Sequence, residues 1–286
     1  MRPARPDDFR LPDLRFLPVD ALIPHEQHDP QRMGPLAERL REQSVLKNPP
    51  IVSPLPPPAN GDRFMVLDGA NRSTAARAAG LPHIVAQVVR YEEPYVELST
   101  WHHALSEMAA DRFENACRTI PELTCERESL LHARALLARR EALAYAVHGD
   151  GSVLVFRGGR TLEDRNALLN RIVDVYRKDC RFYRMSTESF AVARERHPDV
   201  TTLVVFPHFE PAEVMELATS GARLPAGITR HLIRWRALRL NIPLERLADP
   251  RTSIEAKNEW LAEWLQGKWS QRQVRFYEEP TVLFDE

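Results

Sequence analysis

The clearest chemical pattern lies in residues 66–80, where an apolar pair runs into Asp68 and Gly69 and an Ala-rich helical pattern begins at once. A helix N-terminus presents unpaired N–H groups and partial positive charge, which favour phosphate binding. Glycine lets the backbone approach an anion closely, and Arg72, Ser73 and Thr74 add a cation and two hydroxyl donors. The pattern predicts a phosphate-binding turn in which Asp68 could hold a metal ion. The alternative is an ordinary helix capped by Asp68.

A second candidate is the carboxylate of Glu26, which follows a short apolar stretch at residues 22–24. At the end of a strand this carboxylate could serve a site, or it could be a solvated loop residue. The nearby His25 and His28 only faintly resemble a metal motif, because they lack the i, i+4 spacing of two zinc-binding histidines on a helix. The sequence does not favour a zinc site here.

The third candidate is the segment 224–234, in which small turn residues precede Thr229, Arg230 and His231. Five arginines and no acidic residue occur from Arg223 to Arg239. Such a cluster attracts phosphate or carboxylate groups. The alternative is a basic helix face.

Length, composition and charge restrict the class of protein. The 286 residues suit one large domain or two smaller ones, and 43% hydrophobic with 28% charged residues is ordinary for a soluble globular protein. The net charge of −1 argues against a surface devoted to nucleic acid. Three cysteines without a CxxC pair indicate a reducing compartment. Because the sequence shows no signal-like N-terminus and no apolar run of about eighteen residues, we expect a soluble cytoplasmic protein.

The order of elements predicts an α/β protein with two units, the second beginning near residue 120. Expected strands lie at 14–19, 51–53, 63–67, 84–89, 152–156, 180–184 and 202–206. Expected helices lie at 31–44, 71–80, 103–118, 124–147, 161–178 and 211–220. In the tail, Trp260, Trp264 and Trp269 form a stripe that we expect to dock on the body of the protein.

Residues 17–89 resemble the ParB N-terminal, sulfiredoxin-like fold. The matching features are the turn at 22–26, a helix ending in Gln43-Ser44, the stretch 47–52, and Asp68-Gly69-x-x-Arg72 at the start of a helix. Glu26, the run 68–74 and a distal Gly-Ile-Thr-Arg-His motif at 227–231 together resemble the free serine kinases, which phosphorylate L-serine to O-phospho-L-serine. The resemblance covers the first hundred residues strongly and the rest mainly through residues 224–244.

The resemblance implies a role for each matched residue. Glu26 would be the catalytic carboxylate that accepts the serine hydroxyl proton, and Asp68 would act beside it in catalysis and in holding Mg²⁺, for which Glu26 is a further candidate. The nucleotide phosphates would lie against Gly69, Ala70, Asn71, Arg72, Ser73 and Thr74. The amino acid would be surrounded by Ser44, Trp101, Thr229, Arg230 and His231. The expected domains are a nucleotide-binding domain at 1–100 and a second α/β, substrate-binding domain with a helical tail at 101–286.

The phosphoryl donor is left open, as ATP or ADP, because this chain has Ala70-Asn71 where the kinases have a histidine pair. The alternative function is a ParB-like DNA-binding or nucleotide-dependent transcriptional regulator. Such a protein should carry a helix-turn-helix domain, whereas strands are expected at 152–156 and 202–206. A sulfiredoxin-like reductase would need a cysteine beside the phosphate turn, where this chain has none. The expected partners are therefore L-serine and a nucleotide, with nucleic acid less favoured, no membrane, and the oligomeric state open.

Overall fold

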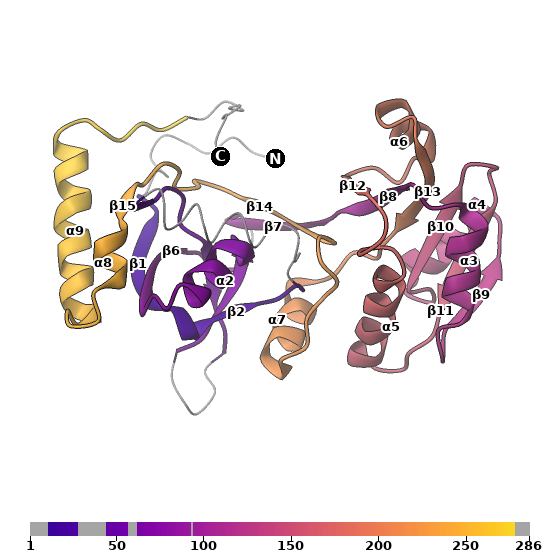
Figure 1. Cartoon of the computed structure of the whole chain (residues 1–286), viewed down its shortest axis with the longest axis horizontal. Coiled ribbons are helices and arrows are strands. Elements are labelled where there is room, and N and C mark those ends of the chain that lie inside the picture. The colour runs from indigo at the N-terminus through magenta and orange to yellow at the C-terminus, as the bar shows by residue number, and fades with distance from the viewer. Residues whose placement is uncertain (1–10, 28–43, 57–61, 93, 278–286) are drawn as a thin grey trace.

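Two β-sheets organise the chain, and they lie toward opposite ends of its long axis (Figure 1). The computed structural model describes residues 11–27, 44–56, 62–92 and 94–277. Within these residues, one sheet has five strands in the order β1-β6-β4-β5-β2, and the other has six in the order β12-β8-β13-β10-β11-β9. Helices accompany both sheets, so the predicted α/β class is confirmed.

The first sheet carries the turn at Asp68. It consists of β1 (Asp13–Pro18), β2 (Leu22–Pro24), β4 (Ile51–Pro54), β5 (Phe64–Asp68) and β6 (His83–Val88), with a 3-10 turn at Val19–Ala21 and helix α2 at Ala70–Ala78. The pairs β2–β5 and β4–β6 are parallel, whereas β1–β6 and β4–β5 are antiparallel. As predicted, a buried strand ends at Asp68 and a helix starts two residues later.

Elements from the end of the chain return to this first sheet. β15 (Ile242–Pro243) pairs with β3 (Val45–Leu46), and α8 (Leu244–Ala248) and α9 (Ile254–Ser270) lie beside β1 and β6 (Figure 1). Apolar side chains from these elements complete the core of the first sheet. The helical tail, predicted as part of the second domain at 101–286, therefore packs on the first sheet.

The tryptophan stripe of α9 provides part of this contact. Trp260 packs edge-on against Phe16, with ring centroids 6.2 Å apart, and Trp264 borders the same core. Trp269, in contrast, is 50% exposed. The predicted docking of the tail helix is confirmed for the first two tryptophans.

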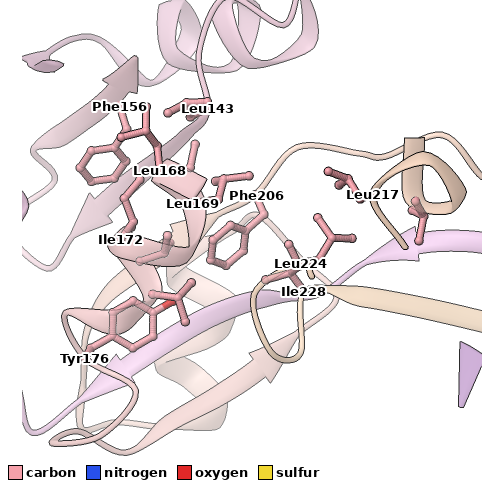
Figure 2. Close-up of a cluster of buried hydrophobic side chains, with 14 of the residues drawn as sticks. Leu143, Phe156, Leu168, Leu169, Ile172, Tyr176, Phe206, Leu217, Leu224 and Ile228 are labelled. Carbon is pink, nitrogen blue, oxygen red and sulfur yellow. The ribbon is translucent and has the colours of Figure 1, made fainter. Parts of the chain in front are cut away.

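The second sheet is antiparallel and comes from the middle of the chain. Its strands are β8 (His102–Ser106), β9 (Thr124–Arg127), β10 (Ala144–His148), β11 (Val153–Arg157), β12 (Phe182–Met185) and β13 (Val200–Val205). The helices of this part are α3 (Ala110–Arg118), α4 (Leu130–Ala138), α5 (Leu162–Asp174), α6 (Phe190–Arg196) and α7 (Pro211–Ser220). In the core shown in Figure 2, side chains of α5 meet Leu224 and Ile228 from a later loop. Among the described helices, none is both long enough and apolar enough to cross a membrane.

A two-stranded ribbon joins the two halves of the molecule (Figure 1). β7 (Val96–Thr100) pairs antiparallel with β14 (Thr229–Ile233), so that Thr100 lies opposite Thr229. One residue separates β7 from β8 of the second sheet, and β14 follows the loop 224–228. The alternative of a basic helix face at 229–233 is therefore wrong, because this segment satisfies its backbone groups by pairing with β7.

The helices expected at 103–118 and 124–147 are only partly correct, because α3 and α4 occupy part of each predicted range and strands occupy much of the rest. The stretch 124–147 divides into β9, α4 and β10, and the stretch from residue 103 begins with β8 before α3 starts at Ala110. All residues of β8 and of β10 are buried. A short apolar run that is buried on both faces cannot be distinguished from a buried helix by its periodicity.

The helix expected at 31–44 lies mostly outside the described residues. Its last residue, Ser44, is described and has a left-handed backbone with φ of 54°, so it does not continue a helix. The Ser44 carbonyl accepts a hydrogen bond from the Leu244 N–H (2.8 Å) at the start of α8. Ser44 thus belongs to the contact between β3 and the C-terminal elements.

Candidate active site

Glu26 lies where the first sheet meets the loop before β14. The chain pairs with that loop directly after it, because the Gln27 N–H donates to the Leu224 carbonyl (2.8 Å). Glu26 Oε2 accepts the Gly227 N–H (2.8 Å), and Oε1 accepts both the N–H (2.7 Å) and the hydroxyl of Thr229. The side chain is 14% exposed, so the alternative of a solvated loop glutamate does not hold. Two segments far apart in the sequence hold one carboxylate in a fixed orientation.

The loop that holds Glu26 depends on glycine at position 227. Gly227 has φ of 76°, a left-handed conformation that side chains disfavour. A Cβ at this position would also overlap the guanidinium of Arg184, which lies against the loop from β12. On either side of Gly227, Leu224 and Ile228 are fully buried in the core of the second sheet (Figure 2). The two N–H donors to Glu26 therefore come from an anchored loop and from the first residue of the strand that follows it.

Two histidines and a tyrosine lie around this carboxylate. His25 Nδ1 donates to the Val66 carbonyl (2.5 Å), and its Nε2 lies 2.8 Å from Thr229 Oγ1. The ring of His231 stands edge-on to that of His25, with centroids 5.0 Å apart, and His231 Nε2 lies 2.8 Å from Tyr91 Oη. His25 links Val66, in the middle of β5, to Thr229, a role that the sequence did not predict.

The electrostatics of this group keep His231 and Tyr91 uncharged. Burial, and then the neighbouring His25, lower the pKa of His231 well below its ordinary value. Burial, and then the charge of Glu26, raise the pKa of Tyr91 above its ordinary value. Tyr91 therefore donates its hydroxyl proton to a neutral His231. Nothing in the local sequence around Tyr91 signals this contact, which forms only in the fold.

The turn after β5 has the geometry expected of an anion site. Gly69 is the N-cap of α2 with φ of 87°, and a Cβ there would lie 3.0 Å from Pro50 Cα. Only glycine fits this conformation beside the neighbouring loop without strain. Arg72 Nη1 donates to the Asn48 carbonyl (2.9 Å), so the Arg72 side chain fastens that loop to α2. The free N–H groups of the first helical turn are thus framed by Gly69 and Arg72.

The other predicted phosphate ligands lie on the first two turns of α2 and differ in how accessible they are to an anion. The Ser73 hydroxyl is buried and donates to the Gly69 carbonyl (3.1 Å), so it serves the helix itself. Ala70 and Asn71 form the first turn of α2, and Thr74 is partly exposed in the second. The backbone of the first turn is therefore better placed for an anion than the Ser73 side chain.

The basic segment reaches this turn through Arg236. The guanidinium of Arg236 forms a hydrogen bond to Asp68 Oδ2, which also accepts Arg72 Nη2 at 3.3 Å. Arg230 instead places its guanidinium 4.5 Å from the centre of the Trp101 ring. The Trp101 N–H donates to the Ile228 carbonyl (2.8 Å), within the loop that holds Glu26. The ribbon thus pairs Arg230 with Trp101 next to the loop of Glu26, on the face of β14 opposite to that of Thr229 and His231. Arg236 is an addition to the predicted set.

The residues present fit a magnesium ion at Asp68. Mg²⁺ is usually held by one or two carboxylates, several waters and the phosphates of a substrate. Asp68 is 37% exposed, and its hydrogen bonds to the two arginines both involve Oδ2. Within the described residues no group of three or more His, Cys, Asp or Glu side chains is arranged to hold a metal ion by itself, so the carboxylate would act together with phosphate. Glu26 is less suited to a metal, because both of its oxygens already accept hydrogen bonds.

The fold is one that solved free serine kinases share. A free serine kinase in complex with AMP gives a TM-score of 0.70 at 17% sequence identity, covering 83% of this chain and 95% of that one. A C-terminally truncated SbnI from Staphylococcus aureus gives a TM-score of 0.67 at 22% identity, covering 91% of this chain and 97% of that one. No known protein-family model matches the chain.

Curated relatives identified by sequence are named as kinases of L-serine. An ATP-dependent L-serine kinase of Staphylothermus marinus is 35% identical over 90 residues, so the match spans 32% of this chain and only 34% of that protein. The ATP-dependent L-serine kinase SbnI of Staphylococcus aureus is 23% identical over 276 residues, which cover 96% of this chain and 97% of SbnI. The ADP-dependent L-serine kinase SerK of Thermococcus kodakarensis is 20% identical and covers 82% of this chain and 93% of SerK. The resemblance to free serine kinases is confirmed.

Proposed function

We propose that the protein is a cytoplasmic free serine kinase, which transfers a phosphoryl group from ATP or ADP to the hydroxyl of L-serine and forms O-phospho-L-serine. The observation that supports this most is the carboxylate of Glu26, fixed by Gly227 and Thr229 beside the ribbon that carries Arg230 and His231. The similarity to kinases named for ATP and for ADP supports the class of reaction. It leaves the donor open.

In this proposal the nucleotide phosphates bind at the N-terminus of α2, where Gly69 leaves room for them and the first-turn N–H groups donate hydrogen bonds to their oxygens. Glu26 accepts the proton of the serine hydroxyl as the serine oxygen bonds to the terminal phosphorus. The bond from that phosphorus to the bridging oxygen breaks, and its electrons leave with the shortened nucleotide. Phosphoryl transfer needs positioning and charge neutralisation more than covalent help from the protein. Mg²⁺ held by Asp68 and the phosphates would supply part of that neutralisation.

The amino acid needs a cation for its carboxylate and a surface for its small side chain. Arg230 is the proposed cation, because it directly follows Thr229 on β14 and its guanidinium lies over the ring of Trp101, whose backbone N–H pairs with the loop of Glu26. Thr229 and His231 lie on the same strand, where Thr229 binds the carboxylate of Glu26 and His231 packs against the neighbouring His25. Ser44 is kept as a proposed substrate residue from the resemblance alone.

A ParB-like regulator receives less support from the structure. Among the described residues, the region after β7 builds a six-stranded antiparallel sheet with α/β packing. Recognition of a DNA major groove by such a regulator would require a helix-turn-helix unit there. The six-stranded sheet in this region therefore supports the kinase better than the regulator.

The direct test is incubation of the purified protein with L-serine, Mg²⁺ and either ATP or ADP, followed by mass spectrometry. We expect O-phospho-L-serine to form with at least one donor, and omission of Mg²⁺ by excess EDTA to stop its formation. The donor that supports the faster rate identifies the physiological nucleotide class. If well-folded protein yields no product with either donor, the kinase proposal is refuted.

The contact between Thr229 and Glu26 gives a second test. Thr229→Val removes the hydroxyl that donates to Glu26 but keeps the branched shape and the backbone N–H. A hydrogen bond to a charged group contributes about 1.5–3 kcal/mol, so we expect kcat to fall by about tenfold or more. The matched control is Thr100→Val on the opposite strand, whose hydroxyl donates to the Pro207 carbonyl (3.2 Å). Equal kcat values in the two variants would contradict a role of the Thr229 hydroxyl in orienting Glu26.

A further inference from the structure

A chain of hydrogen bonds runs from the core of the second sheet to Glu26. Tyr176 Oη lies 2.7 Å from His103 Nδ1, and His103 Nε2 lies 3.0 Å from the Gly227 carbonyl oxygen. The N–H of the same Gly227 donates to Glu26 Oε2 at 2.8 Å. His103 and Tyr176 are both completely buried. These two residues have no part in the mechanism derived above.

The direction of each hydrogen bond in this chain is determined by its chemistry. The Gly227 carbonyl can only accept, so His103 carries its proton on Nε2 and donates to it. Nδ1 of the neutral ring then accepts the hydroxyl proton of Tyr176. Burial lowers the pKa of His103 to about 3, which keeps the ring neutral, and burial also raises the pKa of Tyr176 well above its ordinary value. The neutral tautomer of His103 with its proton on Nε2 therefore satisfies both hydrogen-bond partners, the Gly227 carbonyl and the Tyr176 hydroxyl.

The position of the His103 ring is set by the packing around it. His103 lies on β8, and its ring centroid is 4.4 Å from that of Phe182 and 4.9 Å from that of Phe206. Tyr176 and Phe206 belong to the cluster that also buries Leu224 and Ile228 (Figure 2). The imidazole is therefore a rigid donor aimed at the loop that holds Glu26.

Gly227 is the most flexible residue of this loop, and a donor to its carbonyl restricts the conformation of the loop. Glycine has access to more backbone conformations than any other residue, and Gly227 occupies a left-handed one. Its carbonyl lies between the two N–H groups, of Gly227 and of Thr229, that bind Glu26. A hydrogen bond to this carbonyl fixes the Gly227–Ile228 peptide plane, which connects the two peptide planes that carry those N–H groups. Without the bond, the two donors could turn away from the carboxylate.

We propose that His103, oriented by Tyr176, is a positioning residue for the catalytic base: it holds the Gly227 carbonyl and thereby orients the carboxylate of Glu26. This inference rests on the proposed kinase function. In this inference, residues in the core of the second sheet determine the orientation of the Glu26 carboxylate, although Glu26 itself follows β2 of the first sheet. His103 touches no substrate, so its loss should change turnover and leave nucleotide binding intact.

The test compares His103→Leu with His103→Gln in the intact protein. Leucine fills much of the space but cannot donate, whereas the side-chain amide of glutamine can donate to the Gly227 carbonyl from a similar reach. We expect His103→Leu to lower kcat by about tenfold with the KM for nucleotide changed less than about twofold, because small misplacement of a catalytic group costs rate. His103→Gln should recover kcat to within about threefold of the unmodified protein. Tyr176→Phe removes only the hydroxyl that orients His103 and should lower kcat by about threefold. This variant replaces His103→Leu in the test if the leucine variant does not fold.

A second readout does not depend on activity. Hydrogen exchange at the Gly227 amide, followed by NMR, should be at least about tenfold faster in His103→Leu than in the unmodified protein or in His103→Gln. Unchanged kcat and exchange in His103→Leu would overturn the inference, as would equal losses in the leucine and glutamine variants. If the unmodified protein forms no O-phospho-L-serine, the proposed function fails, and the exchange measurement still decides whether His103 holds the loop.

Discussion

Replacing Glu26 with glutamine should lower kcat by about 10²–10⁴-fold, the usual contribution of a positioned general base. The amide cannot accept the hydroxyl proton of serine. Glutamine also brings an NH₂ group toward two N–H donors, those of Gly227 and Thr229, where the carboxylate now accepts with both oxygens. The nucleotide is proposed to bind at the N-terminus of α2, so its dissociation constant should change by less than about threefold. Steady-state kinetics and calorimetric titration with ADP measure the two quantities separately.

The matched control is Glu97→Gln, which makes the same chemical change at an exposed position of β7. We expect this variant to retain full kcat. Full activity in Glu26→Gln would remove Glu26 from the role of base. Loss of nucleotide binding together with activity would instead show that the substitution disturbs the whole site.

Replacing Arg72 with methionine should weaken nucleotide binding by about 30–100-fold. Arg72 fastens the loop at Asn48 to the first turn of α2 and pairs with Asp68. Its loss removes a cation from the proposed phosphate site and leaves the Asp68 carboxylate with less neutralisation. Charge-assisted hydrogen bonds of this kind contribute about 1.5–3 kcal/mol each. Titration with ADP in the presence of Mg²⁺ measures the effect.

Arg77→Met provides the comparison within the same helix. Arg77 also donates to two backbone carbonyls, those of Val19 (2.9 Å) and Leu22 (3.0 Å), but it lies near the C-terminal end of α2. We expect both variants to lose some thermal stability and only Arg72→Met to lose nucleotide affinity. An equal loss of affinity in the two variants would mean that α2 as a whole, and not its N-terminus, determines binding.

The turn at Asp68 could be predicted from the sequence because its strand, glycine and helix are consecutive in the chain. A buried strand, a glycine and an Ala-rich helix follow one another within residues 66–80, and the structure has β5, Gly69 and α2 in that order. The cation at Arg72 is likewise only a few residues away. Short-range pattern and turn chemistry are sufficient to recognise such a unit.

The surroundings of Glu26 could not be derived from local pattern. Its donors, Gly227 and Thr229, lie some two hundred residues away, and only the resemblance to serine kinases placed them in one site. Tyr91 and His103 enter through tertiary packing and have no signature in their own segments. The same limit explains why the sequence predicts a single helix at 124–147. The strand β10 is buried on both faces, so its sequence lacks the alternation of apolar and polar residues that would identify a strand.

The proposed function, phosphorylation of free serine, is decided by the conversion of ¹³C-labelled L-serine to labelled O-phospho-L-serine by the intact protein with Mg²⁺ and ATP or ADP, quantified by mass spectrometry. We predict labelled product that increases linearly with enzyme concentration and is lost in Glu26→Gln. Folded protein that binds nucleotide but forms no labelled O-phospho-L-serine with either donor would contradict it.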